Sequence, residues 1–288
     1  MPGETRRAVH AQPEWLRAVP TDRRLPDDAT VVHTGCGTSF HAAATGGWAV
    51  QALEAVLAPP RADIMVCVSH EGDTQLTMEA ERAFGGDVWL VTGKPESPLA
   101  EFVDEVIVCT PEVERSWCHT ASYTCAVAAI RALHGEDVDW LPGAVEEELA
   151  REVQPFEQSR VIVAGAGRDW PTAQEAALKL REGAWVDATA FETEQLLHGY
   201  LAAVDEHVRA YVLEGEGRAA ERAADAAAAL EALGCETTLV PTRHPVVDIV
   251  RFQLLTLAVA DARGIDPDPI RRADGSRWAT AAGSAYPY

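Results

Sequence analysis

The feature that most constrains the fold of this chain is a regular alternation of short, β-branched apolar segments with longer helical patterns. The strand-like segments occupy residues 30–35, 62–69, 87–92, 104–110, 160–167, 208–213 and 236–241. The helical patterns occupy residues 39–57, 74–84, 117–134, 171–185, 217–233 and 245–262. Because strands that alternate with helices in this way are typical of parallel sheets covered by helices, we expect an α/β fold.

The alternation begins in the same way in both halves of the chain. The segments VVHTGCGTSFHAA and VIVAGAGRDWPTAQEAA each run through a strand, a glycine turn and the start of a helix. We interpret this as an internal duplication that gives two three-layer α/β/α domains, at residues 30–140 and 157–262. The sequence further predicts a helical arm over 1–29, a linker helix near 140–156 and an aperiodic C-terminal arm over 263–288.

Composition excludes several classes of function. The 288 residues carry a formal net charge of −21, whereas nucleic-acid backbones are bound by clustered Lys and Arg, so we expect no nucleic-acid partner. No segment approaches the roughly 18 apolar residues of a membrane span, and the N-terminus has no apolar signal core, so we expect no membrane association and a cytoplasmic location. The six cysteines form no C-x-x-C pair and the nine histidines show no ligand spacing. We therefore expect reduced thiols and no metal.

The segment between residues 173 and 199 carries the strongest candidates for catalysis. Glu175, Lys179 and Glu182 are spaced i, i+4, i+7, which places them on one face of a helix among alanines and leucines. Lys179 is one of only two lysines among the 24 basic residues, and a buried ammonium, unlike a guanidinium, can lose its proton. Charged groups in apolar surroundings are the ones that carry out proton chemistry. The alternative is a surface Glu–Lys pair that supports the helix by a few tenths of a kcal/mol.

Two polar turns predict a binding pocket. GCGTS (35–39) and SHEGDT (69–74) each follow a strand and open a helix, and the carboxyl ends of neighbouring parallel strands meet at one edge of a sheet. Small residues there let backbone N–H groups reach an anion; the alternative is that their hydroxyls only cap the helices. Phe40 and Trp170 replace the third glycine of a dinucleotide fingerprint, so we expect no nicotinamide cofactor.

Five motifs in order resemble the sugar isomerase (SIS) domain family. They are GCGTSFHAA, SHEGDT, the segment Glu114–Thr124 with its E-x-x-x-x-x-T-x-x-Y-T pattern, E-x-x-x-K-x-x-E, and LLHGYLA. The resemblance covers about residues 30–270, and the motif order is similar to the isomerase half of glucosamine-6-phosphate synthase and its stand-alone deaminase, deglycase and ketose/aldose isomerase relatives. It implies two SIS domains, a homodimer with sites between subunits, a sugar-phosphate substrate and no cofactor.

The resemblance also implies residue roles. Glu182 resembles the base that moves a proton between C1 and C2 of an open-chain sugar, and His198 resembles the group that opens the ring from the partner subunit. Lys179 and Glu175 resemble supporting charges. The positions that resemble the family's sugar-phosphate site are Cys36, Gly37, Thr38, Ser39, Ser69, His70, Glu71, Thr74, His119 and Thr120. This fits the chemistry, because isomerisation needs a carboxylate near the α-carbon proton and a partner for the enediolate oxygen.

Three departures from the family pattern qualify these expectations. No glutaminase domain precedes residue 30, so we expect no glutamine-dependent amination. The arm segment RRADGSRW (271–278) has no lysine for the Schiff base that the family synthase forms. Its arginines, Arg271, Arg272 and Arg277, either supply positive charge to a substrate or belong to a solvated tail.

The third departure concerns the phosphate loop. Glu71 replaces the second serine of the family's S-x-S-G-x-[ST] loop, and His119 replaces another family serine. A carboxylate that faces a phosphate dianion costs several kcal/mol unless it is paired, and a protonated His119 is a candidate partner. The main hypothesis is an isomerase, deaminase or deglycase that acts on a sugar phosphate. The alternatives are a non-catalytic regulatory protein that binds a sugar phosphate, and the same fold serving an unrelated small acid or sugar.

Overall fold

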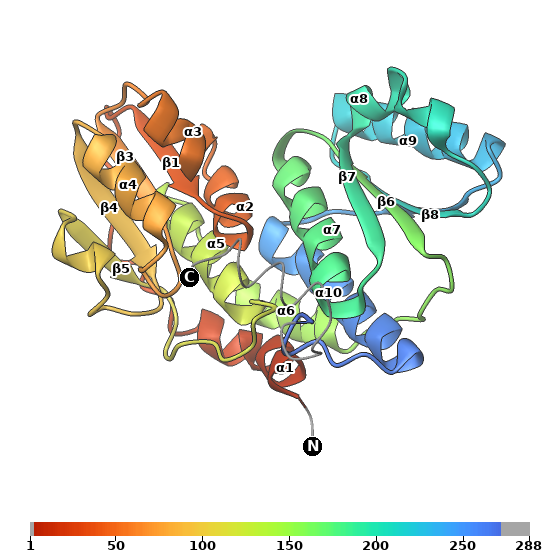
Figure 1. Cartoon of the computed structure of the whole chain (residues 1–288), viewed down its shortest axis with the longest axis horizontal. Helices are drawn as coiled ribbons and strands as arrows, with labels where there is room; N and C mark the ends of the chain where they lie inside the picture. Colours follow the sequence, from red (N-terminus) through yellow and green to blue (C-terminus); the bar gives the residue numbers. More distant parts are fainter. Residues whose placement is uncertain (1–2, 272–288) are drawn as a thin grey trace. The chain divides into compact units, whose positions relative to one another are not determined.

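A computed structural model of the chain describes residues 3–271, which form two compact units (Figure 1). The N-terminal unit comprises the described residues up to Glu147, together with Arg271, and the C-terminal unit comprises Glu148–Ile270. Arg272 and Arg277 of the predicted arm lie outside the described residues. Within residues 3–271 no helix is long and apolar enough to cross a membrane.

The N-terminal unit is built on a five-stranded parallel sheet with the order β2-β1-β3-β4-β5. The strands are β1 (Val31–Gly35), β2 (Ala49–Gln51), β3 (Ile64–Val68), β4 (Asp87–Thr92) and β5 (Glu105–Val108). The helices are α1 (Glu4–Leu16), α2 (Thr38–Ala44), α3 (Ala52–Leu57), α4 (Gln75–Ala83), the 3-10 turn η1 (Leu99–Glu101), α5 (Ala121–Leu133) and α6 (Leu141–Leu149), whose last residues belong to the C-terminal unit.

The C-terminal unit is built on a four-stranded parallel sheet with the order β7-β6-β8-β9. Its strands are β6 (Arg160–Gly165), β7 (Asp187–Glu192), β8 (Val208–Leu213) and β9 (Glu236–Val240). Its helices are α7 (Trp170–Ala184), α8 (Thr193–Leu197), α9 (Arg218–Ala232) and α10 (Pro245–Arg263), with 3-10 turns η2 (Gly167–Asp169) and η3 (Tyr200–Ala203). The predicted α/β class with two helix-covered parallel sheets is confirmed, and the order β7-β6-β8-β9 matches that of the first four strands of the N-terminal sheet, β2-β1-β3-β4.

The structure differs from the sequence expectation in one predicted helix, over 39–57, and in two edge strands, β2 and β7, that the sequence did not predict. The helix expected over 39–57 is wrong, because α2 ends at Ala44 and the edge strand β2 follows. Gly46 and Gly47 cause the break: a Cβ on Gly46 would lie 2.4 Å from Nε2 of His33, and Gly47 has φ +111°, a region open mainly to glycine. In the second unit the equivalent edge strand β7, with sequence DATAFE, was not expected, because it is too polar to be recognised as a strand.

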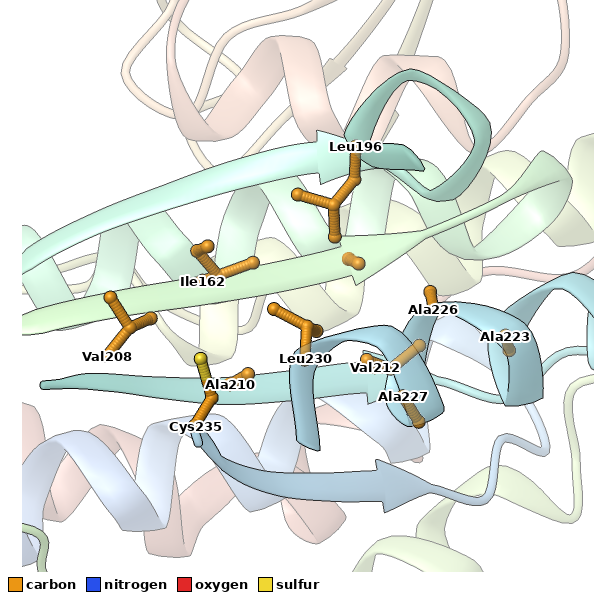
Figure 2. Close-up of a cluster of buried hydrophobic side chains, with 11 residues drawn as sticks. Ile162, Leu196, Val208, Ala210, Val212, Ala223, Ala226, Ala227, Leu230 and Cys235 are labelled. Carbon is orange, nitrogen blue, oxygen red and sulfur yellow. The ribbon is translucent and has the colours of Figure 1, made fainter. Parts of the chain in front are cut away.

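A hydrophobic cluster joins α8 and α9 to one face of the C-terminal sheet (Figure 2). Its buried members are Ile162, Ala164, Leu196, Val208, Ala210, Val212, Ala223, Ala226, Ala227, Leu230 and Cys235. The α9 members are spaced three and four apart, so they lie on one helical face. Three of them are alanines, which let α9 approach the sheet closely, and Leu230 is the large side chain that fills the remaining space.

We expect Leu230→Ala to destabilise the C-terminal unit by about 2–5 kcal/mol, because the leucine is fully buried and its removal leaves a cavity. Urea denaturation followed by circular dichroism measures the effect. The matched control is Leu233→Ala at the end of the same helix, where the side chain is 39% exposed and the expected change is within about 0.5 kcal/mol. Equal effects of the two substitutions would contradict the packing described.

Candidate functional site

The first polar turn connects β1 to α2 at the carboxyl edge of the N-terminal sheet. A Cβ on Gly35 would lie 2.9 Å from the backbone carbon of Ser39, so only glycine lets the helix begin directly against the strand. Gly37, with φ +54°, is the N-cap residue, and no side chain caps the helix. Thr38 and Ser39 lie in the first turn of α2, so the proposed use of their hydroxyls as N-caps is wrong.

Cys36 completes this turn. Its Sγ lies 4.0 Å from Oγ1 of Thr77. Burial raises the pKa of the Cys36 thiol, which keeps it protonated at neutral pH. A protonated thiol is a weak nucleophile, so Cys36 suits a role in lining a pocket better than one in covalent catalysis.

The second polar turn, between β3 and α4, is organised by Ser69. The buried Oγ of Ser69 accepts a hydrogen bond of 3.1 Å from the N–H of Gly72 and lies 3.3 Å from Oγ1 of Thr74. Gly72 has φ +64°, and a Cβ there would lie 2.1 Å from Oγ of Ser97. Thr74 is the N-cap residue of α4 but its side chain caps nothing. The two hydroxyls therefore share one hydrogen bond, and one hydroxyl hydrogen is left for a ligand.

The predicted motif residues Glu114 and Thr120 hold the start of α5. Oε1 of the buried Glu114 accepts hydrogen bonds from N–H (2.7 Å) and Oγ1 (3.0 Å) of Thr120. Oε2 accepts from the N–H of Ser122 at 2.7 Å. A carboxylate at a helix N-terminus is stabilised by the helix dipole and by the backbone donors. The hydroxyl hydrogen of Thr120 is thereby used inside the protein, which argues against its predicted contact with substrate as a donor.

His70 and His119 lie beside this cap, with ring centroids 5.3 Å apart. Nε2 of His70 accepts a hydrogen bond of 2.9 Å from the N–H of Glu114. Burial, with His119 adding to it, lowers the pKa of His70 to about 4, so His70 is neutral at pH 7 with its proton on Nδ1. His119 has φ +40°, which is unfavourable for a residue with a side chain, and its Nδ1 lies 3.4 Å from Oγ of Ser122.

A pocket of about 490 Å³ opens next to the two histidines. Its lining includes Glu71, Glu112, Arg115, Trp117 and His119. The structure thus brings the two departures from the family pattern, Glu71 and His119, into one pocket of the N-terminal unit. Glu71 is exposed and forms no ion pair with any residue between 3 and 271, so the suggested Glu71–His119 pair is not formed.

The charged stripe on α7 is buried. Nζ of Lys179 lies 2.7 Å from Oε2 of Glu182 and 3.3 Å from Oε1 of Glu175. Lys179 and Glu175 are fully buried, whereas the side chain of Glu182 is 22% exposed. The alternative of a surface Glu–Lys pair is therefore wrong. Two carboxylates share one ammonium, which leaves the stripe with a formal charge of −1, and Glu182 is the member that a ligand can reach.

His198 follows α8 and is exposed. Its side chain is 71% exposed and its Nε2 lies 2.8 Å from Oε1 of Glu194. Glu194 also accepts a hydrogen bond of 2.7 Å from Nε of Arg222. Within one chain His198 and Glu182 thus pair with different side chains. Their meeting across a subunit contact stays a prediction.

The carboxyl edge of the C-terminal sheet holds two buried carboxylates that the sequence did not reveal. Oδ2 of Asp169 accepts a hydrogen bond of 3.1 Å from Oγ1 of Thr242. Asp248, in the first turn of α10, accepts hydrogen bonds of 2.9 and 3.1 Å from the N–H of Arg243. Burial, with the neighbouring Asp169 adding to it, raises the pKa of Asp248 to about 7. Only the fold brings these residues together, because they are 79 positions apart in the sequence.

Comparisons with known proteins place this fold. No family model matches the chain. Two curated glutamine–fructose-6-phosphate aminotransferases (isomerizing) are similar in sequence: that of Gloeobacter violaceus is 27% identical over 82% of this chain and 49% of its own length. That of Zymomonas mobilis is 24% identical over 89% and 54%. The chain therefore spans about half the length of these relatives.

Three solved structures share the fold over almost their whole lengths. The C-terminal domain of glucosamine-fructose-6-phosphate aminotransferase from Francisella tularensis has a TM-score of 0.75 at 19% identity, covering 93% of this chain and 98% of that one. Glucosamine-6-phosphate deaminase from Thermotoga maritima has a TM-score of 0.75 at 19% identity, covering 93% of this chain and 97% of that one. Tagatose-6-phosphate ketose/aldose isomerase from Escherichia coli has a TM-score of 0.74 at 15% identity, covering 93% of this chain and 95% of that one.

The chain thus has the fold of a double sugar isomerase (SIS) domain protein, with one parallel sheet in each unit. Its sequence relatives narrow this class. Among double-SIS proteins, the chain resembles the isomerase half of the glutamine–fructose-6-phosphate aminotransferases.

We expect Asp248 to make the stability of the protein fall as the pH rises. The folded protein holds the Asp248 proton up to about pH 7, whereas an ordinary aspartate ionises near 3.8. Between these values the folded state binds one proton more than the unfolded chain, so the free energy of unfolding falls by about 1.4 kcal/mol per pH unit. Asp248→Asn removes this contribution.

The measurement is urea denaturation of wild type and Asp248→Asn between pH 4.5 and 8. The difference between their free energies of unfolding is expected to change steadily in favour of the variant as the pH rises. Asp261→Asn, at an exposed position of the same helix, is the control and should follow the wild type. A pH-independent difference for Asp248→Asn would show that the carboxyl group is already ionised at pH 4.5.

Proposed function

We propose that the chain is an enzyme that acts on a sugar phosphate by proton transfer on the open-chain form, as an aldose–ketose isomerase or an aminosugar-phosphate deaminase or deglycase. The observation that carries the proposal is the buried Lys179 between Glu175 and Glu182, with Glu182 the only partly exposed member. The names of the relatives support it, since they include aminotransferases that isomerise, a deaminase and a ketose/aldose isomerase of sugar phosphates.

In the proposed mechanism Glu182 is the general base. Its carboxylate removes the proton from the carbon next to the sugar carbonyl, and the electron pair of the broken C–H bond moves into an enediolate. Return of the proton from Glu182 to the neighbouring carbon, together with transfer of a proton from the hydroxyl oxygen of the enediolate to the former carbonyl oxygen, completes the isomerisation. Lys179 keeps the base in place through the 2.7 Å contact, and Glu175 partly offsets the lysine charge.

The other roles follow the family resemblance. We propose that His198 opens the sugar ring from the partner subunit of a homodimer in the cytoplasm. The hydroxyls of Ser39, Ser69 and Thr74 are proposed to bind the phosphate, supported by the free hydroxyl hydrogen in the Ser69–Thr74 pair. Neutral His70 and the Glu114 cap then act as positioning groups for the β5–α5 loop.

A second candidate function is regulatory binding of a sugar phosphate without turnover. The altered phosphate loop supports it, because Glu71 replaces a serine of the family pattern, shares its pocket with Glu112 and would disfavour a phosphate placed in the family manner. A protein of this kind shifts its melting temperature with a sugar phosphate but exchanges no protons with it.

Glu182→Gln is expected to abolish turnover while the fold and ligand binding persist. The assay is exchange of the C2 proton of hexose 6-phosphates in deuterated water, followed by NMR, and the expected loss is about 100-fold or more. The matched control is Glu231→Gln on α9, an exposed glutamate of the same unit, which should keep wild-type exchange. Undiminished exchange in Glu182→Gln sinks the catalytic assignment, and a wild type that binds without exchange supports the regulatory function.

Glu71→Ser is expected to lower the KM for a hexose 6-phosphate about tenfold, because it removes a negative charge next to the proposed phosphate position. Steady-state kinetics, or a binding titration if turnover is absent, measures the change. Glu54→Ser on α3, also exposed, is the control for a general loss of negative charge. An unchanged KM in Glu71→Ser would mean that the phosphate does not approach this carboxylate.

A further inference from the structure

A second pocket, of about 420 Å³, lies entirely within the C-terminal unit. It is formed by the segment after α6, strands β8 and β9, and helix α10, and three arginines line it: Arg151, Arg209 and Arg251. No residue of the α7 stripe lines it, nor does His198. Three arginines around one pocket are unusual in a chain with a formal net charge of −21.

A buried carboxylate holds two of these arginines by one nitrogen each. Oε2 of Glu148 lies 2.8 Å from Nε of Arg151, and Oε1 lies 3.0 Å from Nε of Arg251. Glu148 is buried. The terminal Nη atoms of Arg151 and Arg251 donate no hydrogen bond to any residue between 3 and 271. Both groups are thus oriented in advance, with donors left over, which is the arrangement that binds a carboxylate or phosphate.

Arg209 forms a fixed wall of the same pocket. Its guanidinium lies 4.5 Å from the centre of the Tyr211 ring and donates hydrogen bonds to Oγ1 of Thr238 (2.6 Å) and to the carbonyl of Glu236 (2.7 Å). The charge of Arg209 is partly offset by the Glu236 carboxylate, 3.3 Å away. Arg209 therefore shapes the pocket, and Arg151 and Arg251 supply its unused donors.

The floor of the pocket is apolar. Tyr211 and Phe252 meet edge to face with ring centroids 5.6 Å apart, and Leu255 and Pro241 continue this surface. One acidic side chain, Glu152, also lines the pocket; it is exposed and accepts a hydrogen bond of 2.8 Å from Gln154. The pocket thus combines two guanidiniums, whose Nη donors have no hydrogen bond, with an apolar surface.

We propose that this pocket is a binding site for a small organic anion. A carboxylate or phosphoryl group of the ligand accepts hydrogen bonds from the terminal nitrogens of Arg151 and Arg251, and an apolar body covers Tyr211 and its neighbours. The Arg151–Glu148–Arg251 arrangement leaves one formal positive charge for the ligand after Glu148 is counted. This site is separate from the α7 stripe and does not depend on the proposed function. A ligand bound there stabilises the folded C-terminal unit by mass action.

Calorimetric titration of the full chain tests the proposal with four probes: phenyl phosphate, phenylacetate, inorganic phosphate and benzyl alcohol. Phenyl phosphate and phenylacetate distinguish the two headgroups, inorganic phosphate lacks the apolar body, and benzyl alcohol lacks the charge. At least one of the two aromatic anions is expected to bind more tightly than inorganic phosphate and benzyl alcohol, and its affinity is expected to weaken with added salt. Ser69→Ala, in the proposed phosphate-binding turn of the other unit, should leave this affinity unchanged.

Arg151→Gln and Arg251→Gln are each expected to lower the affinity of that anion about tenfold or more, because each loses charge-assisted hydrogen bonds. Arg218→Gln on α9, where the side chain is 79% exposed, is the matched control and should bind as the wild type does. If Arg251→Gln fails to fold, Arg151→Gln decides, since its side chain is 56% exposed.

Three outcomes overturn the proposal. One is the absence of saturable binding of both aromatic anions up to about 10 mM. Another is equal affinity in the wild type and in the Arg151 and Arg251 variants. The third is loss of the affinity in Ser69→Ala, which would place the anion in the proposed sugar-phosphate site instead.

Discussion

The arrangement of the charged side chains on α7 depends on the ion pairs that the ammonium of Lys179 forms with Glu175 and Glu182. Two carboxylates and one amine occupy a helix face that is otherwise made of alanine and leucine, and two of the three groups have no contact with water. Loss of one partner from such a buried cluster typically costs about 3–5 kcal/mol. The cluster is therefore weak evidence for stability but strong evidence for function, since apolar residues at all three positions would pack at lower electrostatic cost. It also fixes the direction in which Glu182 presents its second oxygen.

The same carboxyl edge is used differently in the two sheets. In the N-terminal unit it carries hydroxyls, two histidines and a glutamate consumed as a helix cap. In the C-terminal unit the corresponding edge carries the buried Asp169 and Asp248; the guanidinium of Arg168 lies 3.9 Å from Asp169, but burial outweighs its effect and raises the pKa of both carboxyl groups. The two sheets thus carry two kinds of polar edge. The hydroxyl-rich edge of the N-terminal sheet suits the binding of an anion. The edge of the C-terminal sheet instead holds a carboxyl group, Asp248, that keeps its proton up to about pH 7.

The sequence predicted what depends on local pattern. Most strands and long helices, the two-sheet architecture and the position of the Glu175–Lys179–Glu182 stripe follow from periodicity alone. The edge strands β2 and β7 did not follow, because short edge strands need not be apolar on both faces. The break after Ala44 depends on the space next to His33, which no local pattern encodes.

The hydrogen-bond partners of the candidate site residues also could not be predicted from the local sequence pattern. Thr120 and Glu114 were recognised as a motif, yet their hydrogen bonds turn inward to α5. The Asp169–Asp248 neighbourhood and the two guanidiniums on Glu148 join residues that are far apart in the chain. Such groups meet only when the units are folded, so sequence spacing carries no signal for them.

Gly165 has a mechanical consequence for the chemistry of α7. A Cβ at this position would lie 2.7 Å from the carbonyl oxygen of Asp169, so the turn that leads into α7 rests directly on the end of β6. The start of α7 therefore cannot slide along the sheet, so the position of Glu182 on this helix is fixed relative to β6. A methyl group at position 165 would shift the turn at the start of α7 and, with it, the carboxylate of Glu182 about three helical turns further along the chain.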